Sequence, residues 1–167
     1  QTNSQNDIWT CANSIYTING FCNGCVQPNT EGWLVSPKFQ LNTAFQRHFD
    51  FDLVQSFVGP AMQLYYTTNF TGNPATTSWI LLGNVSGSGA KSFNISSVTG
   101  SDIQFAFKYT ADGTSGGSAA YTVSNLKFLS DDCNNTILLS CSITDISQWN
   151  INGCNNQGTT STLDDTY

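Results

Sequence analysis

The chain has 167 residues, of which 39% are hydrophobic, 13% aromatic and only 10% charged. Five basic against 11 acidic residues give a net charge of −6, which excludes the basic face that a nucleic-acid-binding protein needs. No apolar run approaches the roughly 20 residues of a membrane-spanning helix, and the aromatic content excludes a disordered chain.

Alternation of apolar and polar residues predicts strands, and turn residues interrupt the chain at intervals of about ten residues, as in a sandwich or barrel. The clearest strand spans 47–53, where Phe49, Phe51 and Leu53 point to one face. Strands with one apolar and one polar face belong in antiparallel sheets packed face to face, so we predict an all-β sandwich. Further strands are expected at 62–66, 79–82 (a short buried strand), 93–95, 103–109 and 121–128.

The composition changes where Asp131, Asp132 and Cys133 follow the last predicted strand. We therefore divide the chain into a sandwich over 1–130 and a short disulfide-bearing C-terminal extension over 131–167. The extension has too little apolar surface to fold alone. We expect it to dock on the sandwich or to begin a following β module.

Six cysteines, an even number, lie in Gly- and Asn-rich segments near the two ends of the chain. Together with four Asn-X-Ser/Thr sequons and the low charge, they predict an extracellular, oxidised protein whose signal peptide has already been removed. A redox or zinc role for the Cys22–Cys25 spacing lacks a predicted helix or a second matching pair. The cysteines are Cys11, Cys22, Cys25, Cys133, Cys141 and Cys154, and the candidate glycosylation sites are Asn69, Asn84, Asn94 and Asn134.

A weak internal repeat bears on the disulfide pairing. Residues 17–20, before Cys22, are similar to residues 150–153, before Cys154. If the repeat is real, Cys11–Cys22 and Cys141–Cys154 are equivalent, which leaves Cys25 to pair with Cys133. Six cysteines allow 15 connectivities, so the others stay open.

Residues 32–41, GWLVSPKFQL, resemble the opening motif of choice-of-anchor J or cleaved-adhesin domains, modules of secreted Bacteroidetes-type surface proteins. Residues 103–109 and 121–128 resemble the closing strand pair of the same domains, so the resemblance covers about 30–130. It implies a jelly-roll topology and a structural Ca²⁺, although Ser124 stands where the family usually has Asp. Residues 154–167 are similar to the start of repeats in large secreted bacterial surface proteins.

The sequence offers few residues for acid–base or nucleophilic catalysis. His48 is the only histidine, and Glu31 is the only glutamate available for a carboxylate pair. His48, Asp50 and Asp52 alternate along one strand face at about 7 Å, which is typical of a solvated face. We therefore expect no enzyme. The candidate Ca²⁺ ligands are Asp50, Asp52, Asp131 and Asp132.

Aromatic residues give the other candidate site. We expect Trp9, Trp149 and Tyr65 at the surface, where they could stack on sugars, whereas Trp33 and Trp79 sit in apolar strand patterns typical of the core. This is the basis of our alternative interpretation, a carbohydrate-binding module attached to a secreted enzyme. A small hydrolase with an unseen site comes third.

The uncharged or nearly uncharged segments 2–10 and 160–167 could add a strand to a neighbour's sheet. Our leading prediction is therefore a non-catalytic extracellular adhesive or structural module, part of a surface protein or a subunit of a filament assembled by β-strand contacts. Its expected partners are copies of itself, adjacent modules and glycans.

Overall fold

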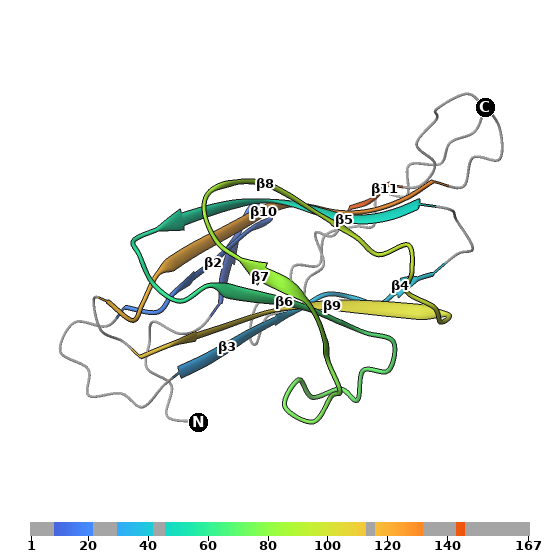
Figure 1. Cartoon of the computed structure of the whole chain (residues 1–167), viewed down its shortest axis with the longest axis horizontal. Helices are drawn as coiled ribbons and strands as arrows, with labels where there is room; N and C mark the ends of the chain where they lie inside the picture. Colours follow the sequence, from blue (N-terminus) through green and yellow to red (C-terminus); the bar gives the residue numbers. More distant parts are fainter. Residues whose placement is uncertain (1–8, 22–29, 42–45, 113–115, 132–142, 146–167) are drawn as a thin grey trace.

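The computed structural model of the chain describes residues 9–21, 30–41, 46–112, 116–131 and 143–145 (Figure 1). Over these ranges the chain forms strands and no helix, which confirms the all-β prediction. The strands are β1 (Thr10–Ala12), β2 (Ile15–Asn19), β3 (Thr30–Val35), β4 (Phe39–Gln40), β5 (Gln46–Ser56), β6 (Met62–Thr67), β7 (Ile80–Val85), β8 (Gly89–Asn94), β9 (Asp102–Ala111), β10 (Ala120–Asp131) and β11 (Ile143–Asp145).

The strands form two antiparallel sheets that pack face to face as the two layers of Figure 1. Sheet A has the order β1-β2-β10-β5-β8, with β11 also paired to β10, and sheet B has the order β3-β9-β6-β7, with β4 also paired to β9. The pairs β2–β10, β3–β9, β5–β8 and β6–β7 are nested one inside the other along the chain. This winding is that of a jelly roll, so the predicted sandwich and its topology are confirmed.

Aromatic side chains from both inner faces fill the core. Phe49 of β5 stacks on Phe105 of β9 with ring centroids 4.1 Å apart, and Phe51 meets Phe107 edge to face at 4.9 Å. The predicted alternation of β5 and β9 is confirmed, because successive side chains of a strand point to opposite faces. Ala106 is the exception on β9, since it points outward and is still fully buried.

A bulge interrupts β10 where its pairing with β5 shifts between Ser124 and Lys127. Asn125 takes a left-handed backbone conformation there (φ 51°), which Asn tolerates better than most residues. Its amide Nδ2 donates a 2.5 Å hydrogen bond to Asp52 Oδ2 on β5. The bulge therefore allows a side-chain hydrogen bond between β10 and β5 on the outer face of sheet A.

One expectation about the strands changes. The buried strand predicted at 79–82 is wrong, because β7 begins at Ile80, and Ile80 and Leu81 are 54% and 48% exposed. The physical reason is that β7 is the last described strand of sheet B, with no neighbour on one side among the residues that the structure describes. β10 ends at Asp131, and β11, the described part of the extension, pairs with β10.

Candidate functional site

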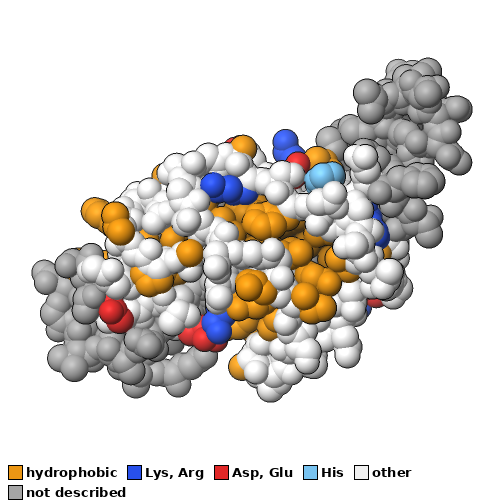
Figure 2. Space-filling model, in the orientation of Figure 1, with side chains coloured by type: hydrophobic (Ala, Val, Ile, Leu, Met, Phe, Trp, Pro, Cys, Tyr) orange, Lys and Arg blue, Asp and Glu red, His pale blue; other side chains and the backbone are white. Residues whose placement is uncertain are grey.

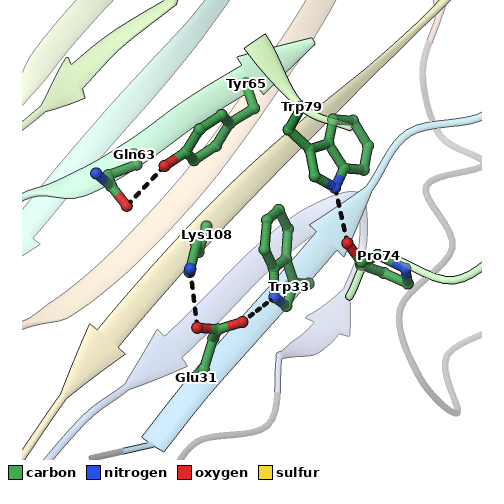
Figure 3. Close-up of polar contacts among 7 residues, drawn as sticks. All are labelled: Glu31, Trp33, Gln63, Tyr65, Pro74, Trp79 and Lys108. Carbon is green, nitrogen blue, oxygen red and sulfur yellow. Dashed lines mark hydrogen bonds and ion pairs between the residues drawn. The ribbon is translucent and has the colours of Figure 1, made fainter. Parts of the chain in front are cut away.

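The outer face of sheet B carries an aromatic cluster that the strand register assembles (Figure 3). Trp33 on β3 lies opposite Lys108 on β9, and Lys108 lies opposite Gln63 on β6. Tyr65 follows Gln63 by two residues and so shares its face. Leu34, the neighbour of Trp33, points the other way and is fully buried in the core.

The rings contact one another across the sheet. Trp33 and Trp79 stack with centroids 5.6 Å apart and planes 24° apart, and Tyr65 lies 5.9 Å from Trp33. Phe70 extends the cluster, 5.8 Å from Trp79. All four side chains are half-buried, so each keeps some surface in solvent. We call Trp33, Tyr65, Phe70 and Trp79 the aromatic face.

The loop between β6 and β7 holds Trp79 in place. Asn73 organises this loop: its side-chain oxygen accepts from the amide of Ala75 at 2.9 Å, and its carbonyl accepts from the buried Thr77 hydroxyl at 2.8 Å. The indole N–H of Trp79 donates to the carbonyl of Pro74 at 2.9 Å. Because these bonds are internal to the loop, Trp79 is fixed before any ligand arrives.

A polar rim borders the aromatic face. Lys108 Nζ lies 2.8 Å from Glu31 Oε2 and 5.0 Å from the centre of the Trp33 ring, an ion pair beside a cation–π contact. The indole N–H of Trp33 donates to Glu31 Oε1 at 2.5 Å. On the other side, the Tyr65 hydroxyl donates to Gln63 Oε1 at 3.0 Å.

Glu31 stays ionised within this rim. Partial burial acts to raise the pKa of Glu31, but the hydrogen bonds from Lys108 and Trp33 and the charge of Lys108 outweigh it and leave the pKa below its usual value. The rim is therefore a neutralised ion pair. It offers hydrogen-bond donors and acceptors without a net charge.

The arrangement is better suited to stacking a ligand on the aromatic rings than to making or breaking covalent bonds. Both indole N–H groups of the aromatic face already have acceptors, so the rings present their flat apolar surfaces. A partner with a flat apolar face and polar edges would pack on the rings and bond to the rim.

The aromatic residues predicted from the sequence are placed differently from expectation. Tyr65 belongs to the aromatic face, but Trp9 is only 3% exposed and packs on Phe107 in the core, so its prediction as a surface residue is wrong. The core prediction for Trp33 and Trp79 is also wrong, since both lie on the outer face. Trp149 lies outside the described residues.

The predicted calcium ligands do not converge in the part of the chain that the structure describes. Asp50 and Asp52 lie half-buried on the outer face of sheet A, where Asp52 is bonded to Asn125. Among the described residues, no group of three or more potential metal ligands occurs. The side chains of Asp131 and Asp132 lie outside them. Ca²⁺ binding stays a prediction.

Cys11 is disulfide-bonded, and the other five cysteines lie outside the described residues, so the pairing stays a prediction. Three sequon asparagines are exposed, and the fourth, Asn134, is not described. Asn84 is on β7 and lies opposite Gln63 of β6, so it shares the face of the aromatic cluster. The other two exposed sequons are Asn69 and Asn94.

Comparison with known proteins adds no family: no protein-family model and no curated protein matches the chain. Within the described ranges, no helix long and apolar enough to cross a membrane occurs.

Proposed function

We propose that the chain is a non-catalytic extracellular adhesive module that binds glycans through the aromatic face. The observation that carries the proposal is the pre-organised stack of Trp33 and Trp79, with Tyr65 beside it, on a solvent-facing sheet. A pyranose ring has an apolar C–H face that packs on an aromatic ring and hydroxyl groups around its edge. The two halves of this site match those two parts of a sugar.

The rim favours uncharged sugars. Lys108 and Glu31 neutralise each other, so the described residues of the site offer no free charge to pair with a uronic acid or a sulfated sugar. The hydroxyl groups of a neutral or N-acetylated sugar can instead bond to Glu31, Lys108 and Gln63, whose side chains keep some surface in solvent. This choice of ligand class follows from the charge balance of the rim.

A glycan array with neutral, N-acetylated and uronic-acid oligosaccharides tests the proposal, followed by calorimetric titration of the best neutral ligand. Trp79→Ala should lower the affinity at least about tenfold, or about 1.4 kcal/mol, because it removes one ring of the stack. Phe57→Ala is the matched control, since Phe57 is an aromatic residue 75% exposed on another loop. Equal effects of the two substitutions, or retention of uronic acids only, would contradict the proposal.

A further inference from the structure

Within the described ranges, the sandwich has an open side, where the last strand of each sheet lies. β7 ends sheet B and β8 ends sheet A, and the two are consecutive in the chain. Figures 1 and 2 have the same orientation, with β7 and β8 toward the viewer. On this face, Figure 2 shows hydrophobic side chains between the two layers. A strand at the end of a sheet has unpaired backbone N–H and C=O groups that can bind a further strand.

The β7 edge lacks the side chains that usually prevent such pairing. Its six residues, ILLGNV, include no charge and no proline, and Ile80 and Leu81 are about half exposed. β8 differs, because Lys91 lies opposite the core residue Phe51 and so places a charge on the inner side of the edge. Inward-pointing charges are a known protection of edge strands, and β7 has none.

The apolar interior reaches this edge. The Phe93 ring of β8 lies against Gly83 of β7, where an added Cβ would be 3.1 Å from the ring. Phe93 stacks on Phe51 at 6.0 Å, and it is only half-buried, as is Leu82. An added strand would therefore bury apolar side chains as well as satisfy backbone groups.

We propose that β7 pairs antiparallel with β7 of a second copy, so that sheet B continues from one molecule into the other. A second copy can approach this edge although the whole chain is acidic. Two chains of net charge −6 repel each other, but β7 itself is uncharged and allows close approach without like charges in contact. A two-fold arrangement also buries Ile80 and Leu81 of both copies at once.

This contact differs from the one expected from the sequence, in which segment 2–10 or 160–167 adds a strand to the sheet of a neighbouring molecule. The described part of the first segment packs on its own molecule, because Trp9 is buried and β1 pairs with β2. Residues 2–8 and 160–167 lie outside the described residues.

Sedimentation velocity over a concentration series tests the pairing on the full chain, with hydrogen exchange to locate it. We expect a monomer–dimer equilibrium and slower exchange of the amides of residues 80–85 at high concentration. Leu81→Lys should shift the equilibrium to monomer by at least about tenfold in Kd, because it places like charges across the two-fold axis. Val54→Lys is the matched control. Val54 is 51% exposed, but it lies on β5, which has a neighbouring strand on each side in sheet A.

Three results would overturn the proposal. One is a monomer at every concentration. Another is a dimer that Leu81→Lys and Val54→Lys weaken equally, and the third is a dimer whose protected amides lie outside β7. Circular dichroism and thermal unfolding of both variants show whether each still folds.

Discussion

The contact of Gly59 with the two residues just before β10 predicts a sharp response to a single methyl group. A Cβ at this position would lie 2.5 Å from the carbonyl carbon of Ser118 and 2.6 Å from the amide nitrogen of Ala119, against 3.4–4 Å for an ordinary contact. The backbone must therefore move by about 1 Å to accept Gly59→Ala. The colliding atoms belong to the main chain and cannot turn aside as a side chain would.

The segment around Ala119 is also held in place. Its amide donates to the Tyr109 hydroxyl at 2.5 Å, and its carbonyl accepts from the amide of Gly20 at 3.1 Å. Ser118 and Ala119 are 2% and 1% exposed. Overpacking together with weakening of one buried hydrogen bond should lower the free energy of unfolding by about 3 kcal/mol.

Urea unfolding followed by tryptophan fluorescence measures this loss, which corresponds to a fall in Tm of about 6–12 °C for a chain of this size. Gly116→Ala is the control, because an added Cβ there meets nothing within 4 Å. It should change the unfolding free energy by less than about 1 kcal/mol. The reasoning is refuted if the two substitutions act alike, or if Gly59→Ala lowers the free energy by less than about 1 kcal/mol.

Three further predictions concern the core, the pH dependence and the disulfide. Phe49→Ala should lower the unfolding free energy by about 3–5 kcal/mol in urea, because the ring is fully buried against Phe105; a loss no larger than that of Phe57→Ala would contradict this. Burial, with the nearby Tyr109, raises the pKa of Tyr121 to about 12, so its protonated form stabilises the fold below pH 10. This stability is lost between pH 10 and 12, and Tyr121→Phe should flatten the alkaline part of a plot of unfolding free energy against pH; an unchanged slope would count against it. Cys11→Ser should lower the unfolding free energy by about 2–4 kcal/mol under oxidising conditions, and the difference from the unaltered chain should shrink in reductant.

Much of the fold could be predicted because strands have a period of two. Phe49, Phe51 and Leu53 alternate with polar residues, and this pattern alone fixes which face of β5 is buried. The same rule fails on β3, where Trp33, Leu34 and Val35 are all large and apolar, so the pattern cannot say which ring faces solvent. Short β1 and β4 give too few residues for any period to show.

The aromatic face could not be predicted for a different reason. Trp33, Tyr65 and Trp79 come from three separate segments, and only the pairing of β3 and β6 with β9 and the fold of the loop after β6 bring them together. A signal was present in the loop, since Asn73 and Pro74 are turn residues that favour a compact loop before Trp79. The burial of Trp9 does not follow from the sequence pattern, because burial of an isolated aromatic residue depends on contacts far away in the chain.

The nested strand pairs also set the order in which the chain can fold. The hydroxyl groups of Thr17 and Thr122 lie 3.4 Å apart across β2 and β10 although 105 residues separate them. During synthesis, β2 emerges early with only the short β1 beside it. Among the described strands, β3 has no partner until β9 has been made, and β2 gains its second partner only with β10. Such long-range pairing is slow, so the apolar sides of the early strands stay open for most of the chain's synthesis. Premature termination before residue 120 would leave β2 and β5 without the strand that joins them.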